Sequence, residues 1–119
     1  MTADQKAQRQ IPEAVFGIKA DIETPNIQGL QDIHPISEKF SKFGPRNFER
    51  QGVASTNASE AAFSGSLSDV SYGLNDLKGD VFGNVGIATY YPTVSFVKAG
   101  RQTLIFLQTD AGWKLVHEH

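Results

Sequence analysis

The sequence predicts an α+β fold, in which helices pack on one face of a mainly antiparallel sheet. Three observations carry this prediction. Apolar residues near the N-terminus recur at spacings of three and four, the period of an amphipathic helix. From Leu67 onward apolar and polar residues alternate, in segments that short glycine-containing turns separate. Helices followed by consecutive strands are the order expected when helices cover an antiparallel sheet.

Length and composition favour one domain that binds neither nucleic acid nor a membrane. The 119 residues suffice for a single core, and we expect a flexible tail over 1–10 and one domain over 11–119. The net charge is -2 and no basic stripe is present, which argues against nucleic acid. The chain has no cysteine, no apolar stretch of membrane-spanning length and no secretory signal core. We therefore expect a cytoplasmic protein.

The first expected helix covers 11–23. Pro12 suits the first turn of a helix, where the missing N–H of proline costs nothing. The pair Thr24–Pro25 ends the helix, because a residue before proline avoids the helical conformation. One face carries apolar residues that must pack against another element, namely Ile11, Val15, Ile18 and Ile22.

Two shorter helices are expected next. Asn26 caps one over 27–33, which ends before a proline. Asn57 is expected to cap the other over 57–65, because Glu60 follows three residues later in a capping-box pattern.

The remaining segments are expected to be strands. A short strand is expected at 36–43, and the stretch that follows can pair weakly as far as Phe48. Longer strands are expected at 68–82, 84–97, 101–109 and 112–118, with hairpin turns at 82–84, 98–100 and 110–112. Connections this short make these four strands consecutive antiparallel neighbours.

The strand at 101–109 is apolar on both of its faces. Ile105 and Leu107 lie on one face, and Leu104 and Phe106 lie on the other. The helices can cover only one of these faces. The other face needs a second partner, most simply the same sheet of a second copy.

The C-terminal sequence resembles a known family. The run GDVFGNVGIATYYPTVSF, followed by GRQTLIFLQTDAGWKLVHEH, is similar to the C-terminal half of SnoaL-like proteins in the nuclear transport factor 2-like superfamily. Those proteins share a G-x-V-A hairpin, an R-x-T strand and a terminal G-W-K-[IV]-V-H-x-H strand. The resemblance is most specific over 79–119 and extends more weakly through LQDIHPISEKFSKFGP. The association domain of calcium/calmodulin-dependent kinase II ends in a similar strand. Gly86 departs from the usual alanine of the hairpin.

This resemblance implies a cystatin-like cone barrel, in which N-terminal helices pack in the concave face of a strongly curved sheet. It also implies an apolar cavity between helices and sheet and a homodimer through the convex sheet face. Members of the superfamily include isomerase-like, dehydratase-like and cyclase-like enzymes as well as binding or assembly modules. The fold alone therefore does not identify the function.

On this cavity interpretation, alternate residues of the last strand point inward. These are Trp113, Leu115, His117 and His119, whereas Lys114, Val116 and Glu118 point outward. A histidine in an apolar cavity is neutral near pH 7 and can exchange a proton, so His117 and His119 are candidate acid/base residues. The alternative is that each imidazole forms a structural hydrogen bond.

Other residues are candidates for ligand contacts. Arg101 and Thr103 match the R-x-T strand, and an inward guanidinium would favour a carboxylate-bearing ligand. The alternative places Arg101 at the rim, solvated or paired. A tyrosine hydroxyl can stabilise an enolate, which makes Tyr72 a catalytic candidate and Tyr90 a ligand contact, and only one of Tyr90 and Tyr91 can face inward. Core packing explains the tyrosines equally well.

The sequence predicts neither a metal site nor a cofactor. A His-x-His strand can chelate a metal, with His34 as a third imidazole, but the sequence places no carboxylate beside them. His34 is otherwise a turn residue or a ligand contact. We therefore expect a cofactor-free protein that binds a small apolar or carboxylate-bearing molecule, possessing isomerase, dehydratase or cyclase activity if it is an enzyme. The alternative is a non-catalytic module for homo-oligomerisation or partner binding.

Overall fold

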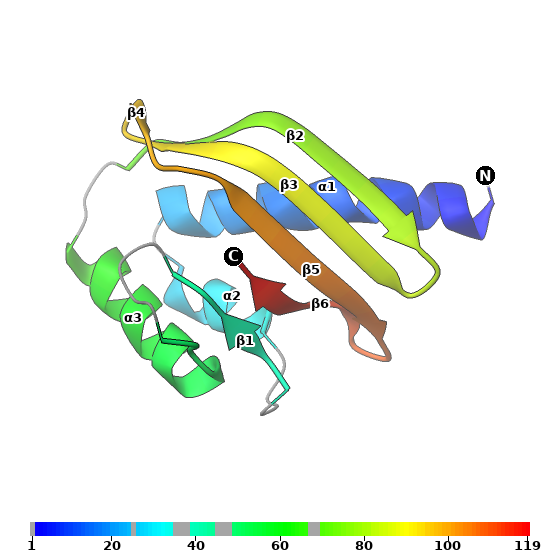
Figure 1. Ribbon diagram of the computed structural model, residues 1–119, viewed down its shortest axis with the longest axis horizontal. Helices are drawn as coiled ribbons and strands as arrows, with labels where there is room; N and C mark the ends of the chain where they lie inside the picture. The colour runs from blue at the N-terminus through cyan, green and yellow to red at the C-terminus, as the bar shows by residue number, and fades with distance from the viewer. Residues whose placement is uncertain (1, 25, 35–38, 45–48, 67–69) are drawn as a thin grey trace.

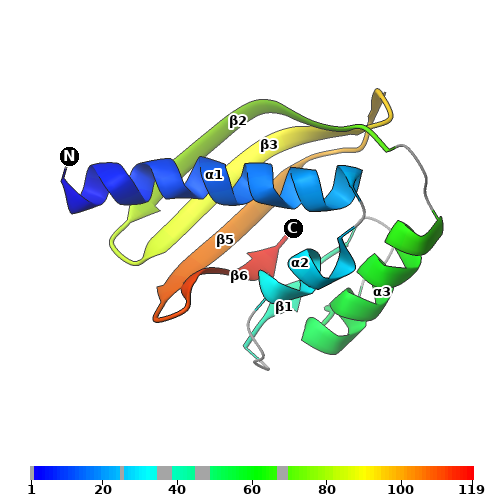
Figure 2. The ribbon, with the colours of Figure 1, turned by 180° about the vertical axis from the view of Figure 1, so that it is seen from behind.

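A long helix crosses one face of a curved sheet, and two shorter helices lie beside one end of that sheet (Figures 1 and 2). The computed structural model describes residues 2–24, 26–34, 39–44, 49–66 and 70–119. The α+β fold class is confirmed. No helix in the described part of the chain is long and apolar enough to cross a membrane.

The helices are α1 (Ala3–Glu23), α2 (Ile27–Asp32) and α3 (Val53–Ser66). The expected start of α1 at residue 11 is wrong, because Thr2 and Gln5 form a capping box and Pro12 lies inside the helix. Asn26 caps α2 as expected, accepting a hydrogen bond from the Gly29 amide at 3.1 Å. Asn57, by contrast, lies within α3, so its expected role as N-cap is wrong.

The sheet has the strand order β1-β6-β5-β3-β2, and β4 pairs with β3. The expected chain of antiparallel neighbours β2, β3, β5 and β6 is confirmed. β1 pairs in parallel with β6, so the last strand lies inside the sheet. The strands are β1 (Ser41–Lys42), β2 (Tyr72–Phe82), β3 (Val85–Val94), β4 (Val97–Lys98), β5 (Gln102–Thr109) and β6 (Gly112–Glu118).

Several strand limits differ from the predictions. The expected strand at 84–97 ends at Val94, because the chain turns through Ser95 and Phe96, both in the left-handed region, and returns as β4. The turns at Gly83 and Gly112 occur as expected, with φ of 64° and 95°. Of the expected strand at 36–43, β1 is the described part; residues 35–38 and 45–48 lie outside the described residues.

The core lies between α1 and the sheet. Ile11 and Val15 of α1 are fully buried, which confirms the predicted apolar face of this helix. They pack against inward residues of the three central strands, where Leu104 and Phe106 occupy one face of β5 as predicted. The core cluster consists of Ile11, Val15, Phe40, Ala88, Tyr90, Leu104, Phe106 and Leu115.

Candidate functional site

A β-bulge in β6 decides which C-terminal side chains face α1. Leu115 pairs with Phe106 and His117 pairs with Ile105, so Val116 is an extra residue on β6. An extra residue reverses the alternation of side chains beyond it. Trp113 and Leu115 face inward as predicted, and Glu118 then joins them.

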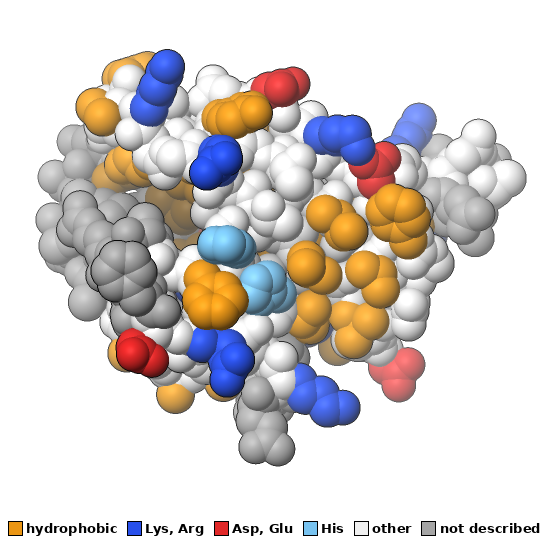
Figure 3. Space-filling view, viewed as in Figure 1, with side chains coloured by type: hydrophobic (Ala, Val, Ile, Leu, Met, Phe, Trp, Pro, Cys, Tyr) orange, Lys and Arg blue, Asp and Glu red, His pale blue; other side chains and the backbone are white. Residues whose placement is uncertain are grey.

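The predicted inward orientation of His117 and His119 is therefore wrong. Glu118 is buried with 6% of its surface exposed, whereas His119 is exposed. Viewed from the side opposite α1, Figure 3 shows histidine side chains at the surface, and His34 is buried. The bulge, and not strict alternation, places a carboxylate in the interior.

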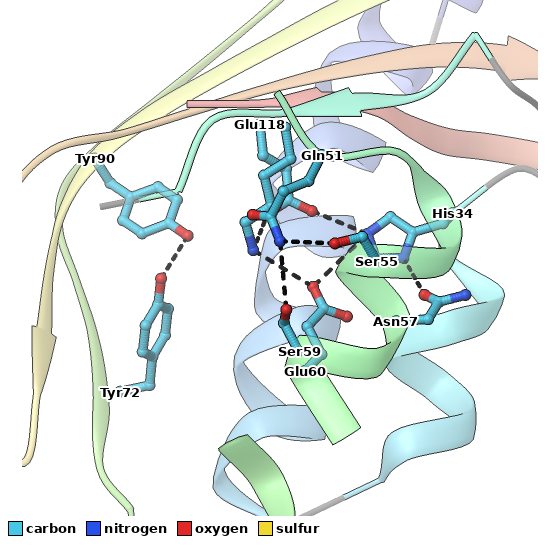
Figure 4. A network of polar contacts seen from close by, with 10 residues as sticks. His34, Gln51, Ser55, Asn57, Ser59, Glu60, Tyr72, Tyr90 and Glu118 are labelled. Atoms are coloured by element: carbon cyan, nitrogen blue, oxygen red, sulfur yellow. Dashed lines mark hydrogen bonds and ion pairs between the residues drawn. The ribbon is translucent and has the colours of Figure 1, made fainter. Parts of the chain in front are cut away.

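The interior carboxylate of Glu118 binds His34, which follows α2. His34 Nε2 lies 2.9 Å from Glu118 Oε1, and His34 Nδ1 lies 3.2 Å from Asn57 Oδ1 on α3 (Figure 4). Both imidazole nitrogens are thus engaged by acceptor oxygens, an arrangement that a doubly protonated imidazolium satisfies best. The ring also packs at 4.7 Å from that of Phe40 in the core.

Glu60 and Lys42 complete this polar cluster. Glu60 Oε1 lies 3.8 Å from His34 Nε2, and Lys42 Nζ lies 3.3 Å from Glu118 Oε2 and 3.9 Å from Glu60 Oε1. Asn57 and Glu60 are three residues apart on α3, so one face of this helix presents both to His34. The cluster brings two carboxyl groups together with two potential cations.

Burial and mutual charge shift the proton affinities in this cluster. Desolvation and the charge of Glu118 raise the pKa of Glu60 to about 7. Burial alone would lower the pKa of His34 and raise that of Glu118. The hydrogen bond between His34 and Glu118, helped by Glu60 for His34 and by Lys42 for Glu118, outweighs burial, so the pKa of His34 is raised and that of Glu118 lowered. Glu60 is thus the carboxyl that exchanges a proton near neutral pH.

A pair of tyrosines lies opposite the cluster. The hydroxyls of Tyr72 on β2 and Tyr90 on β3 are 2.8 Å apart, and both project toward the same interior as Glu118 (Figure 4). Burial raises the pKa of both tyrosines, and the charge of Glu118 adds to this effect. Both hydroxyls are therefore protonated at neutral pH. Because one hydroxyl donates to the other, one O–H proton remains for another acceptor.

The end of α1 holds Tyr72 in place. The Tyr72 amide donates to Glu23 Oε2 at 2.8 Å, and Lys19 Nζ donates to the Tyr72 carbonyl at 2.7 Å. Lys19 and Glu23 also pair with each other at 2.6 Å. Tyr90 is the inward member of its adjacent pair, since Tyr91 is 54% exposed, which confirms that only one of the two faces inward.

The polar cluster contains residue types that bind metals, but it also contains the ammonium group of Lys42. Among the described residues, His34, Glu60 and Glu118 place one ligand atom each within 4.8 Å of one another. The ammonium of Lys42 already lies near oxygens of both glutamates. A metal ion would have to compete with this ammonium, so we interpret the cluster as an ion-pair network.

A separate depression of about 370 Å³ opens beside β1. It shares no residue with the polar cluster, and two of its side chains, Lys39 and Arg50, are basic. Its lining residues are Lys39, Phe40, Ser41, Arg50, Gln51 and Gly52.

The remaining predicted site residues lie elsewhere. Arg101 is exposed just before β5, and Thr103 is on the outer face of β5, because the inward residues of this strand are Leu104 and Phe106. The structure therefore does not bring Arg101 or Thr103 to the interior. Trp113 is inward but serves the core, where its Nε1 donates to Gln10 Oε1 at 2.8 Å. Leu115 is likewise a core residue.

Four residues of the cluster were missed as site residues from the sequence, namely Glu118, Glu60, Asn57 and Lys42. Glu118 was placed outward because no sequence signal announced the bulge at Val116. Glu60 was interpreted as part of a helix cap, and no sequence signal placed its carboxyl in the interior. His34 was found, but as a turn residue or ligand contact.

Comparison with solved structures agrees with the observed fold. A candidate dehydratase of the nuclear transport factor 2-like family from Streptomyces avermitilis superposes with a TM-score of 0.83, at 18% identity over 97% of this chain and 94% of that chain. A candidate ketosteroid isomerase from Shewanella frigidimarina gives 0.72, at 14% identity and 90% of each chain. A candidate calcium/calmodulin-dependent kinase II association domain from Thiobacillus denitrificans gives 0.74, at 12% identity and 89% of each chain.

These similarities show that the chain has the α+β fold of these structures. The family follows from the sequence itself, because residues 11–119 match the SnoaL-like domain. The chain belongs to this SnoaL-like family. Among curated proteins, none matches the chain.

Proposed function

We propose that this SnoaL-like domain binds a small, largely apolar molecule on its concave side and catalyses proton transfer on it, by isomerisation, dehydration or cyclisation. The observation that carries this proposal is Glu60, a mostly buried carboxyl with a pKa of about 7. An acid or base whose pKa lies near the working pH is the most effective proton-transfer group. Oε2 of Glu60 is buried and has no hydrogen-bond partner among the described residues, so this oxygen has unused hydrogen-bonding capacity in the interior.

The other interior residues supply the remaining parts of such a reaction. The hydrogen bonds to Glu118 and Asn57 hold the imidazolium of His34 next to Glu60, so a positive charge lies beside this carboxyl. The free O–H proton of the Tyr72–Tyr90 pair can donate to a carbonyl oxygen as negative charge develops on it. The reaction then needs a base and an oxyanion donor only, which requires no organic cofactor. Structural neighbours named as a candidate dehydratase and a candidate ketosteroid isomerase support this reaction class.

Base-promoted ring opening of a nitrobenzisoxazole tests the proton-transfer role of Glu60, because this probe needs one base and reports its reaction by absorbance. We expect the protein to accelerate the reaction with an apparent pKa near 7. Glu60→Gln should reduce kcat/KM at least a hundredfold, in line with the usual contribution of general acid–base catalysis. His117→Gln is the matched control and should retain the activity. An activity that survives Glu60→Gln but disappears in His117→Gln would reverse the assignment.

A second function, homodimerisation through the convex sheet face, is favoured by the exposed apolar side chains there. Ile105 and Leu107 of β5 are half-buried on the face opposite α1, and Phe82 at the end of β2 is 65% exposed. Apolar side chains gather over the same part of the sheet in Figure 3. Light scattering on Ile105→Lys should report a monomer if this face joins two copies, whereas a dimer unaffected by this charge would contradict the proposal.

A further inference from the structure

Two imidazoles lie next to each other at the C-terminal end of β6, on the face opposite α1 and away from the polar cluster. His117 and His119 are two residues apart, and their ring centroids are 6.5 Å apart. His119 is exposed and His117 is half-buried. Figure 3 shows histidine side chains open to solvent on this face. Neither residue takes part in the interior chemistry proposed above.

The neighbouring strand orients these rings. β1 pairs in parallel with β6, with Ser41 opposite His117, and Ser41 Oγ lies 2.8 Å from Nδ1 of His117. When Nδ1 donates to this hydroxyl, Nε2 of the same ring carries the free lone pair. Phe43 contacts both rings edge-on, with centroid distances of 5.8 Å to His117 and 5.5 Å to His119. Metal-binding histidines commonly have such a second hydrogen bond, which fixes the tautomer and the ring orientation.

We propose that His117 and His119 chelate a divalent transition-metal ion, such as Zn²⁺, Ni²⁺ or Cu²⁺, at an open surface site. Zinc–imidazole bonds of about 2.0 Å place the centroids of two rings on one ion roughly 5 to 6 Å apart. The observed separation of 6.5 Å is slightly larger, and the ring of His119 that would have to move is exposed. Imidazole ligands select these metals over Mg²⁺ and Ca²⁺, which prefer oxygen. Water molecules fill the remaining coordination positions. The two histidines of one chain therefore suffice as protein ligands, and each chain binds one ion.

This site differs from the three-histidine site considered from the sequence. His34 is buried on the opposite face and bound to Glu118, so it cannot reach an ion held by the other two histidines. The metal site therefore rests on the His-x-His pair and on the serine that orients it. It does not depend on the proposed proton-transfer function.

Calorimetric titration of the untagged, chelator-treated protein with ZnCl₂ and NiCl₂ tests the proposal. We expect one ion per chain, with an affinity that falls at least tenfold in His117→Gln and in His119→Gln. Ser41→Ala should lower the affinity by about tenfold or more, the usual effect of removing a hydrogen bond behind a metal ligand. Lys98→Gln and Ser55→Ala serve as matched controls and should bind as the parent does.

Two results would overturn the metal site. One is the absence of binding heat with both metals in the parent protein. The other is binding that persists at full affinity when His117 and His119 are both changed to Gln. Circular dichroism of each variant establishes that the change in affinity does not come from unfolding, since both substitutions lie on the surface.

Discussion

Nε2 of His34 lies 2.9 Å from Oε1 of Glu118, although the two residues are 84 positions apart in the chain. The contact joins the segment after α2 to the last strand, and both side chains are buried, with 1% and 7% exposed. Removing one partner of a buried ion pair leaves the other uncompensated, which costs more than the intact pair contributes. Substitutions in this pair should therefore lower the free energy of unfolding through the loss of a buried electrostatic interaction.

A double-mutant cycle should reveal strong coupling within this pair. We expect His34→Gln and Glu118→Gln each to lower the free energy of unfolding by about 2 to 4 kcal/mol. The double variant should cost at least ~1 kcal/mol less than the sum of the two. Urea denaturation measures each value, and strict additivity would show that the two groups do not interact.

The pH dependence of this coupling follows from the two pKa shifts. The pKa of His34 is raised from 6.5, so its contribution is complete below pH 6.5 and is lost as the pH rises through the folded pKa. The pKa of Glu118 is lowered from 4.5, so its contribution is complete above pH 4.5 and is lost as the pH falls through the folded pKa. The coupling energy should therefore be largest between pH 4.5 and 6.5, and a cycle that strengthens above pH 8 would contradict this.

Ionisation of Glu60 should affect the pH dependence of stability in the opposite direction to ionisation of Glu118. Its pKa is raised from 4.5 to about 7, so the folded protein holds this proton more tightly than the unfolded chain. Stability then falls as the pH rises from 4.5 to about 7. Glu60→Gln should remove this pH dependence. The variant's free energy of unfolding relative to that of the parent should therefore be higher at pH 8 than at pH 4, by on the order of 2 to 3 kcal/mol. Exposed Glu13→Gln is the control, and an equal pH slope in both variants would refute the raised pKa.

A larger residue at Gly86 should destabilise the protein because of the neighbouring Ile11 side chain. A methyl group on Gly86 would clash with Cδ1 of Ile11, whose side chain is fully buried. We expect Gly86→Ala to cost about 1 to 3 kcal/mol through overpacking, and Ile11→Val to recover part of this loss. Gly17→Ala in α1 meets no atom within 4 Å and should be neutral or stabilising. Thermal unfolding that ranks the two glycine variants in the reverse order would contradict this account of the packing.

Gln8 should protect the free edge of β2. Its side-chain amide donates to the Gly79 carbonyl and accepts from the Val81 amide, the latter at 3.1 Å. A glutamine that pairs in this way replaces a neighbouring strand at the sheet edge. Gln8→Ala should speed hydrogen exchange of the Val81 amide at least severalfold and cost about 0.5 to 1 kcal/mol. Arg9→Ala is the control, and unchanged exchange in Gln8→Ala would exclude this protection.

The elements that the sequence predicted well are those with a local signal. The apolar face of α1 and the order of the four strands β2, β3, β5 and β6 follow from periodicity and short turns, and both are confirmed. The start of α1 was missed because the capping residues Thr2 and Gln5 precede a polar stretch that has no apolar period. Asn57 was misplaced because a capping pattern also occurs inside a helix, where this side chain instead binds His34.

The candidate site could be predicted only in part. Tyr72, Tyr90 and His34 were among the expected residues, and the structure brings all three to the interior. Glu118 replaced His117 and His119 there because a single bulged residue, Val116, reverses the side-chain alternation. Such a bulge arises from long-range pairing with Ile105 and Phe106, which a local pattern does not encode.

We expect small organic ligands to bind at the interior cluster around Glu118, and not at the C-terminal histidines, for which we propose a metal ion only. Thermal shifts of the parent protein with steroids, aromatic polyketides, terpenoids and small carboxylic acids test it most directly. A ligand at about a hundred times its Kd adds roughly 2.7 kcal/mol, which moves the Tm by several degrees. We predict that the shift disappears in Glu118→Gln and Tyr90→Phe and persists in the His117→Gln/His119→Gln double variant. A shift that is lost only in the histidine double variant would place the ligand site at His117 and His119 instead.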